Sequence, residues 1–395
     1  MPMDNLSFDD TKVAYAAKTN LQLRKAHYLF FIVKNTLVTK VISNSLNLAI
    51  KLRLPVKYFL RKTVFEHFCG GESIKESTST VTKLWKYNIR SVLDYSVEGK
   101  KSEIAFNKTL DETLKTIINA TGNSSIAFCV FKPTGIGSAE IMEKVQLGHK
   151  LNNTEFIELE KIKARYHKLA KAAYENRVKL LIDAEDSWYQ ETVDSLVYEV
   201  MQKYNKHRVT VFNTYQMYRI ESLSNLKLAL TKAKEQGYKL GVKLVRGAYM
   251  ENERKRATLL NYKDPICVSK SDTDHNYNEA LSLCINQIKH LEVFSGTHNE
   301  TSTQLLMSLM QQVGIHKNDE RVYFSQLYGM SDNISYSLAK AKYNVAKYLP
   351  YGPIRFVMPY LIRRAEENSS VDGQSRKEIT LIKQELERRK LETKL

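Results

Sequence analysis

The segment VKLLID (Val178–Asp183) is a short, apolar and partly β-branched run that ends in a carboxylate. A run of this kind, bounded by segments long enough for helices, is typical of a strand buried on both faces of a parallel sheet. Seven further runs share its character and follow one another along the chain: Ile89–Tyr95, Ile126–Lys132, Val209–Thr214, Leu240–Arg246, Val293–Thr297, Val322–Leu327 and Val345–Leu349. Eight strands separated by segments of helical length predict an α/β fold of the (β/α)₈ barrel type.

A doubly wound sheet is the main alternative for alternating strands and helices. It would have fewer strands and usually a glycine-rich first turn, and no GxGxxG motif is present.

The predicted elements divide the chain into three parts. We expect residues 1–85 to form an N-terminal helical arm, with a glycine-marked hinge at Phe68–Ser77 that leads into the barrel. Residues 86–370 would form the barrel, and residues 371–395 a charged C-terminal helix or tail, exposed or frayed.

The charge of the chain is high and unevenly placed. The net charge is +17 over 395 residues, and residues 11–65 contain no Asp or Glu but eleven Lys and Arg. No segment reaches the roughly 18 uninterrupted apolar residues of a membrane span. A basic, amphipathic helical region suits an anionic membrane surface. Nucleic acid is the competing partner, but no zinc-finger, KH or RRM pattern supports it, and basic helices that simply pack on the barrel remain open.

The cysteines and the start of the chain bear on the compartment. The four cysteines have no CxxC spacing, which favours a reducing compartment over a disulfide framework or a zinc site. The opening MPMDNLSFDD is polar and acidic, unlike a secretory signal or an Arg-rich transit peptide. We expect a cytoplasmic protein that lies peripherally on the inner face of a membrane, and a mitochondrial one only if a transit peptide is missing from this chain.

Polar side chains stand at the ends of nearly all the predicted strands. In a (β/α)₈ barrel the chemistry sits at the carboxyl ends of the strands, where the following loops converge. Reading these ends gives Asp94 and Glu98, Lys132, Asp183 and Glu185, Asn213 and Gln216, Lys243 and Arg246, Thr297-His298-Asn299, Gln326, and Tyr348.

This set of residues permits more than one reaction. A buried lysine at a strand end could form a Schiff base, as in an aldolase. Hydrolase chemistry is disfavoured because neither GxSxG nor HExxH occurs. A metal at His298 is disfavoured because one histidine without a second nearby ligand makes a poor site.

A second informative stretch is YLPYGPIRFVMPYLIRRAEEN (Tyr348–Asn368). It predicts a strand end, a turn through Pro350–Pro353, and a helix that carries Arg363, Arg364 and Glu367. Two adjacent guanidinium groups can hold one carboxylate in a planar fork that lysine cannot reproduce. The plainer interpretation is a solvated charged face at the end of a helix.

Several long motifs in the chain resemble those of the proline dehydrogenase family. They are KLVRGAYMENERKRA (Lys243–Ala257), GTHNE (Gly296–Glu300), QLYGMSDN (Gln326–Asn333), LLIDAED (Leu180–Asp186), VFKPTGIG (Val130–Gly137), FCGGES and the stretch at Tyr348–Asn368. The resemblance runs in collinear order from about Thr11 to Ser370 and is nearest to the stand-alone enzymes. It implies a distorted (β/α)₈ barrel with the last helix over the barrel mouth and non-covalent FAD.

The resemblance also implies a substrate site. Arg363 and Arg364 match the pair that holds the proline carboxylate, with Lys132 as a third cation. Tyr348 matches the tyrosine on the proline ring, which argues for proline over hydroxyproline, and Leu327 matches an apolar contact. Asp183 matches the carboxylate near the amine and Lys132, and Glu98 the acid that pairs with Arg363.

On the cofactor side, the resemblance implies a set of flavin contacts: Asn213, Lys243, Val245, Gly247, Ala248, Thr297, His298, Asn299, Gln326 and Glu367. Glycine at Gly247 would let the backbone approach a ligand closely. Lys243 stands where the bifunctional branch of the family has arginine, and Met250 where that branch has an aromatic residue, so we expect altered flavin tuning.

The implied reaction is the oxidation of L-proline to Δ1-pyrroline-5-carboxylate, the first step of proline catabolism, with a hydride passing from C5 to FAD N5. Electrons would then pass to a quinone in a membrane. No metal and no nucleic acid are expected. The open alternatives are a Schiff-base barrel enzyme and a basic membrane- or nucleic-acid-binding protein without catalysis.

Overall fold

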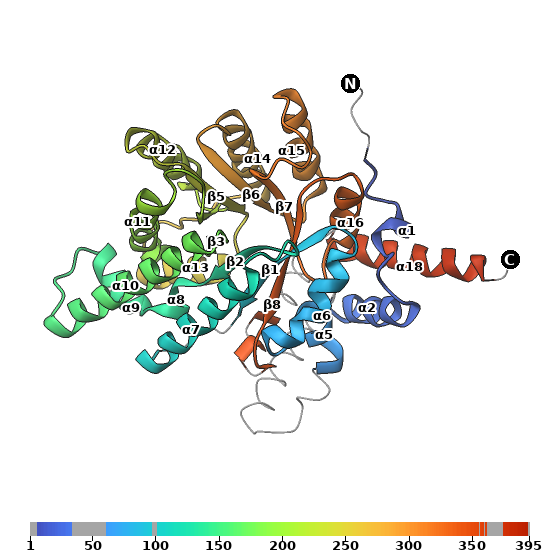
Figure 1. The fold of residues 1–395 in the computed structure, drawn as a ribbon, viewed down its shortest axis with the longest axis horizontal. Helices are drawn as coiled ribbons and strands as arrows, with labels where there is room; N and C mark the ends of the chain where they lie inside the picture. The colour runs from blue at the N-terminus through green and yellow to red at the C-terminus, as the bar shows by residue number, and fades with distance from the viewer. Residues whose placement is uncertain are drawn as a thin grey trace. The chain divides into compact units, whose positions relative to one another are not determined.

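Eight strands form a closed barrel in chain order, from β1 to β8 (Figure 1). The computed structural model describes residues 6–33, 61–96, 101–354, 356–358, 360–361 and 374–393. Neighbouring strands from β2 to β7 pair in parallel, with helices between them. The predicted α/β barrel is therefore confirmed.

The strands lie where the apolar runs predicted them. Their bounds are β1 Ile89–Tyr95, β2 Ile126–Phe131, β3 Lys179–Ile182, β4 Val211–Gln216, β5 Leu240–Val245, β6 Leu291–Gly296, β7 Val322–Leu327 and β8 Val345–Tyr351. β1 and β7 match the predicted ranges, and the others differ only at their ends. β4 extends to Gln216 because Tyr215 and Gln216 pair with Leu244 and Val245 of β5.

The chain divides into two compact units, and the larger comprises residues 92–95 and 99–325. In this unit the helices lie outside the strands (Figure 1). They are α7 Glu103–Ala120, α8 Pro133–Ile136, α9 Ala139–Gln146, α10 Asn153–Glu175, α11 Ser187–Tyr204, α12 Ser222–Glu235, α13 Met250–Leu260, α14 Lys270–Asn286 and α15 Glu300–Gln312.

Local sequence explains where these helices begin. Asn152 and Glu155 form a capping box at the start of α10, and Ser269 and Asp272 form one at the start of α14. Each box satisfies backbone N–H groups that have no partner within the helix. The helices predicted between the strands at Glu155–Asn176 and Ser222–Gln236 are confirmed as α10 and α12.

Aromatic side chains fill the barrel interior near the amino ends of the strands. The ring of Phe128 lies 5.2 Å from Phe212, 4.9 Å from Phe294 and 4.9 Å from Tyr323 between ring centroids, each in edge-to-face geometry. The ammonium of Lys179 lies over three of these rings and pairs with Glu292 at 2.6 Å. This end of the barrel is packed core, which leaves the carboxyl ends for chemistry.

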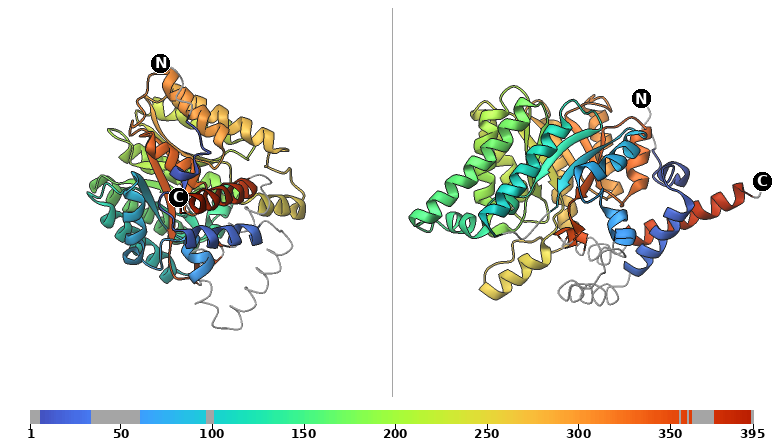
Figure 2. Two further views of the ribbon diagram at one scale, coloured as in Figure 1. Left: turned by 90° about the vertical axis from the view of Figure 1, so that its right-hand side faces the viewer. Right: turned by 60° about the horizontal axis from the view of Figure 1, so that its bottom comes forward.

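The second unit comprises residues 1–91, 96–98 and 326–395. Its described helices are α1 Thr11–Ala14, α2 Asn20–Val33, the π-helix Arg61–Phe65, α5 Glu66–Phe68, α6 Ile74–Trp85, α16 Asp332–Lys340 and α18 Gln374–Glu392. The described segments of residues 1–85 are largely helical, while the predicted bounds of the arm, the barrel and the tail stay a prediction. α2 and α18 run alongside each other (Figure 2).

The charged helix predicted at the C-terminus is α18, and one of its faces packs in the smaller unit. Leu381 and Ile382 of α18 are buried with Leu23 and Phe30 of α2 in one apolar cluster. The outer face of α18 is charged and exposed, whereas Glu378 and Glu385 of the same helix are buried. The apolar residues recur at helical spacing on the inner face.

The glycine hinge is shorter than predicted. α6 begins at Ile74, with Ser73 as its N-cap, so the last four residues of the predicted hinge form the first turn of the helix. Gly71 bridges to Tyr351 at the end of β8, and a Cβ on Gly71 would lie 2.5 Å from the Cβ of Glu76. Glycine is required at this position by that close approach.

Candidate functional site

Four charged side chains meet at the carboxyl ends of β1, β2, β3 and β5. Lys132 Nζ lies 3.1 Å from Asp94 Oδ2 and 3.5 Å from Asp183 Oδ2. Lys243 Nζ donates to the other oxygen of Asp183. The order Asp94–Lys132–Asp183–Lys243 alternates negative and positive charge, and we call it the ion chain.

The ion chain is nearly sealed from solvent. The side chains of Asp94, Lys132, Asp183 and Lys243 are 0%, 9%, 13% and 7% exposed. Buried charges persist only when they are paired, because removing an isolated ion from water costs on the order of several kcal/mol. The two carboxylates and two ammonium groups of the ion chain sum to no net charge.

This geometry bears on two sequence predictions. The expected contact between Lys132 and Asp183 is present. Asp94, however, is the nearer carboxylate to Lys132, and only its position at a strand end signalled it. The family motifs did not single out Asp94, because a carboxylate inside the apolar strand IRSVLDY has no distinctive neighbours in the sequence.

A second polar cluster surrounds Arg246, directly after β5. Its guanidinium donates to Thr297 Oγ1 at 2.6 Å and Ser302 Oγ at 3.0 Å, and pairs with Asp274 at 2.7 Å. The same group lies 4.5 Å from the centroid of the Tyr277 ring. Arg246 therefore joins the end of β5 to the start of α15, a second grouping that the sequence motifs did not assign.

The segment Thr297–Asn299 lies at the amino end of α15. Asn299 is the N-cap, its side chain accepts from the N–H of Ser302, and its own N–H donates to Thr297 Oγ1 at 3.1 Å. His298 is half-buried. A helix amino end beside an arginine is a favourable environment for an anionic group.

Gly247 has positive φ, and its nearest neighbour is a side chain. At φ +135° a Cβ would lie 2.3 Å from Cδ1 of Tyr218. The Tyr218 ring makes a close approach that requires glycine, and the approach of a ligand to Gly247 stays a prediction. Beside it, the N–H of Ala248 donates to Gln216 Oε1 at 3.3 Å, and the Val245 carbonyl accepts from Met217 N–H.

The amide of Asn213 is placed against a covering helix. Its Nδ2 donates to Asp194 Oδ1 of α11 at 2.9 Å, and Gln190 donates to the same oxygen at 2.8 Å. Burial raises the pKa of Asp194, and these two donors oppose the rise. The predicted cofactor role of Asn213 stays a prediction.

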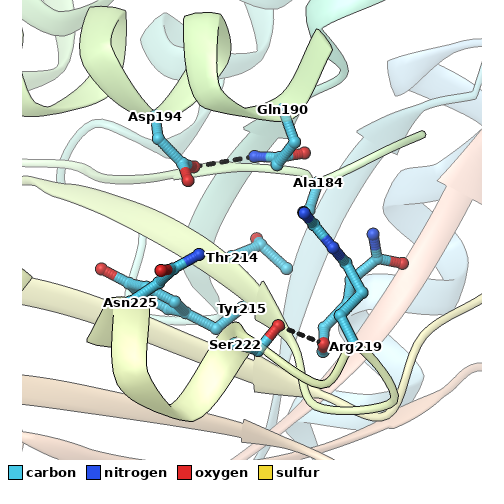
Figure 3. A pocket seen from close by; sticks show the side chains of 9 residues that line it. Ala184, Gln190, Asp194, Thr214, Tyr215, Arg219, Ser222 and Asn225 are labelled. Atoms are coloured by element: carbon cyan, nitrogen blue, oxygen red, sulfur yellow. Dashed lines mark hydrogen bonds between the residues drawn. The ribbon is translucent and has the colours of Figure 1, made fainter. Parts of the chain in front are cut away.

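A small cavity of about 10 Å³ adjoins Asp194 (Figure 3). It is lined by Ala184, Gln190, Asp194, Thr214, Tyr215, Gln216, Arg219, Ser222 and Asn225. A volume of this size holds about one water molecule. It is therefore too small for an amino acid or a flavin.

Three further predicted residues belong to the smaller unit. Gln326 accepts from Ser335 Oγ at 2.7 Å, and Leu327 is half-buried at the end of β7. Tyr348 is 7% exposed in β8, and its carbonyl accepts from Tyr328 N–H at 2.9 Å. The remaining four predicted residues lie outside the described residues: Glu98, Arg363, Arg364 and Glu367.

In the described residues, no group of three or more His, Cys, Asp or Glu side chains is arranged to hold a metal ion. None of the helices described combines the length and apolar character that a bilayer span requires.

Comparison with known proteins identifies the family. The sequence profile described as proline dehydrogenase matches residues 77–377. This chain belongs to the proline dehydrogenase family. The matched residues include the ion chain and every strand of the barrel, and family membership supports an oxidoreductase that acts on proline.

Curated relatives agree. The chain is 32% identical over 429 residues to proline dehydrogenase 1, mitochondrial, of Dictyostelium discoideum, covering 96% of this chain and 74% of that protein. It is 34% identical over 323 residues to the carbapenem antibiotics biosynthesis protein CarD of Pectobacterium carotovorum, covering 82% and 83%. It is 39% identical over 243 residues to the human mitochondrial proline dehydrogenase 1, covering 61% and 40%.

Solved structures share the fold. Proline utilization A from Bdellovibrio bacteriovorus, inactivated by N-propargylglycine, superposes with a TM-score of 0.71 at 19% identity, over 93% of this chain and 37% of that one. A proline utilization A with proline bound in remote sites superposes with a TM-score of 0.67 at 17% identity, over 96% and 44%. The chain thus spans less than half the length of these structures.

Proposed function

We propose that this protein is an FAD-dependent enzyme that oxidises L-proline to Δ1-pyrroline-5-carboxylate. The observation that carries the proposal is the ion chain, which places two buried ammonium groups and two carboxylates at the catalytic end of a barrel of this family. A zwitterionic substrate needs groups of both signs within a few ångströms, and the ion chain supplies them.

Lys132 is the proposed cation for the carboxylate of proline. Its ammonium forms ion pairs with both Asp94 and Asp183, and these two contacts restrict the side chain to one orientation. In a site with little water, a fixed ammonium attracts an anion more strongly than the same group in solvent. Arg363 and Arg364 would complete the carboxylate clamp, with Tyr348 and Leu327 against the ring.

The described side chains fit a flavin. Lys243 offers a buried cation, held by Asp183, for the electron-rich edge of the ring system. Arg246 and the amino end of α15 offer positive charge suited to the pyrophosphate. We assign the cofactor to this side of the barrel mouth, with Ala248, Thr297, His298 and Asn299 as proposed contacts.

The chain's own groups would prepare proline for reaction. The ring is held by its carboxylate, and the amine must be neutral so that its lone pair can form the C5=N bond as a hydride leaves C5. When bound, FAD supplies the two-electron acceptor for that hydride. Positioning the ring at near-attack distance is the main contribution of the protein. Activity should therefore rise with pH through the titration of the substrate amine.

The N-terminal helices suit the proposed delivery of electrons to a membrane quinone. On α2, Leu21, Tyr28 and Phe31 are 65%, 67% and 63% exposed. Arg24 and Lys25 are exposed on the same helix. Apolar and basic side chains together on one helix are typical of binding to an anionic bilayer surface. Peripheral attachment, and with it the cytoplasmic face, stays a prediction.

An absorption spectrum tests the proposal. The purified protein should show flavin bands, and L-proline added without oxygen should bleach them. Arg363→Ala with Arg364→Ala should raise the proline KM steeply while flavin stays bound. A colourless protein that takes up no flavin, or oxidised bands that persist with proline, would contradict the proposal.

A Schiff-base enzyme is the second candidate, favoured by the two buried lysines. A Schiff base forms on the side-chain amine of a lysine. Lys132 and Lys243 both lie beside a carboxylate at the carboxyl ends of the strands. Borohydride trapping of a substrate on either lysine, in a protein without flavin colour, would support this candidate. A binding protein without catalysis is a further alternative. It would bind DNA or vesicles in a salt-sensitive way, and Arg363→Ala with Arg364→Ala would leave that binding intact.

A further inference from the structure

Glu185, two residues after Asp183, is buried and makes a two-pronged contact. One carboxylate oxygen accepts from the N–H of Thr134 at 2.9 Å, and the other accepts from Thr134 Oγ1 at 2.7 Å. Glu185 is 5% exposed. Since Thr134 follows β2 and Glu185 follows β3, this contact joins two neighbouring loops at the catalytic end of the barrel.

The contact supplies a cap that α8 lacks. α8 has only four residues, its N-cap is Lys132, and the Lys132 side chain makes no capping hydrogen bond. Pro133 has no N–H, so Thr134 presents the first backbone donor of the helix. A carboxylate accepting that N–H satisfies the helix end as an N-cap side chain would. Here the cap comes from another loop.

The backbone of Glu185 is itself held by side chains. Its N–H donates to Gln190 Oε1 at 3.2 Å, and its carbonyl accepts from Gln216 Nε2 at 2.7 Å. Gln216 in turn accepts from the N–H of Ala248. The loops after β2, β3 and β5 and the last residue of β4 are therefore tied by one hydrogen-bonded series, Thr134–Glu185–Gln216–Ala248, which we call the loop brace.

The loop brace runs beside the ion chain. Lys132 directly precedes the capped helix, and Asp183 lies on the loop that carries Glu185. The relative position of Lys132 and Asp183 therefore depends on the backbone on both sides of the Glu185–Thr134 contact. A shift of Lys132 would weaken its hold on the substrate carboxylate, because charge-assisted hydrogen bonds depend on distance and angle.

We propose that Glu185 is a positioning residue for proline: by capping α8 from the neighbouring loop, it fixes Lys132 where the substrate carboxylate binds. This inference rests on the proposed function. It assigns Glu185 no contact with substrate. A cap that serves stability alone would leave proline affinity unchanged, which separates the two roles.

The test uses Glu185→Gln and Thr134→Val in the full-length, flavin-loaded enzyme. Each substitution nearly keeps the side-chain volume and removes part of the two-pronged contact. We expect each to raise the proline KM about tenfold while kcat stays within about twofold, the pattern of lost binding that is common to ground and transition states. In the double variant, the proline KM should rise by less than the product of the two single increases, because both substitutions remove the same contact.

Pyrrolidine, which is proline without its carboxylate, separates a loss at the carboxylate position from a general disturbance of the site. Its inhibition constant against proline should stay within about twofold in both variants, since it makes no use of Lys132. Asn152→Ala removes the exposed cap of α10 and is the matched control. It should lower the melting temperature and leave the proline KM unchanged.

The outcomes are distinct. A wild-type proline KM in the variants, or equal losses for proline and pyrrolidine, overturns the positioning role while the wild-type enzyme still oxidises proline. If Glu185→Gln does not fold, Thr134→Val decides, because it keeps the carboxylate and the backbone donor. A wild-type protein that proline does not reduce overturns the proposed function instead.

Discussion

Lys347 and Asp332 form an ion pair of 2.9 Å in which the Lys347 side chain has no exposed surface. Lys18 pairs with the other oxygen of Asp332 at 2.7 Å. Burial raises the pKa of Asp332, but the two lysines outweigh burial and hold this pKa well below its usual range. The pair links β8 to α16 in the same unit as α18.

Lys347→Met should strongly destabilise the protein. The change removes one of two cations from a buried carboxylate, and breaking a buried ion pair typically costs about 3–5 kcal/mol. Urea unfolding measures the loss. Lys340→Met is the control, because Lys340 and Asp10 are 67% and 47% exposed and lie 3.8 Å apart. Equal losses in the two variants would contradict the prediction.

Glu378 of α18 should make stability depend on pH. Burial, followed by the charge of Asp332, raises the pKa of Glu378 from 4.5 to about 7. Between these values the folded protein holds a proton that the unfolded chain releases, so this contribution is complete below pH 4.5 and is lost as the pH rises through 7.

The Glu378 contribution is opposed by His67. Burial and Lys18 lower the pKa of His67 from 6.5 to about 3, so its contribution to stability is lost as the pH falls below 6.5. Comparing wild type with Glu378→Gln at each pH isolates the glutamate. The variant should gain stability relative to wild type from pH 5 to pH 8. Glu387→Gln, exposed on the same helix, is the control for replacing a carboxylate by an amide.

Lys132→Met should raise the proline KM by at least about tenfold, since one charged hydrogen bond contributes about 1.5–3 kcal/mol. Flavin content should stay at the wild-type level, because Lys243 keeps its partner Asp183. Steady-state kinetics and the ratio of flavin absorbance to protein absorbance measure both effects. Lys115→Met, at an exposed ion pair on α7, is the control. An unchanged KM would remove Lys132 from the proposed clamp.

Tyr348→Ser should weaken the preference for proline over hydroxyproline. The side chain is 7% exposed in β8, and serine would leave room for a ring hydroxyl. The ratio of kcat/KM for the two substrates measures the preference and should fall by about 10- to 100-fold, the range for a contact of this size. Tyr348→Phe keeps the ring and should keep most of the preference.

Gly247→Ala should be costly, because a Cβ would meet the Tyr218 ring at 2.3 Å and φ is +135°. Overpacking alone costs about 1–3 kcal/mol. Thermal unfolding should show a clearly larger loss than Gly122→Ala, where φ is +68° and no atom lies within 4 Å of the added carbon. Tyr218→Ala in addition should restore part of the loss.

The sequence predicted the barrel and the location of its eight strands, since apolar runs and their spacing are local properties. It also placed Lys132, Asp183 and Lys243 at strand ends. It did not predict that Asp94 is the nearer partner of Lys132, or that Arg246 meets Thr297. Such contacts depend on strand register and on barrel closure, which join residues far apart in the chain.

The sequence by itself determined the family, the eight strands and the residue types at their carboxyl ends. Only the tertiary structure decided which charges pair, which loop caps α8, and which face of α18 is buried. The physical reason is that an apolar pattern specifies which side of an element is buried, whereas a partner for a buried charge is specified by three-dimensional distance alone.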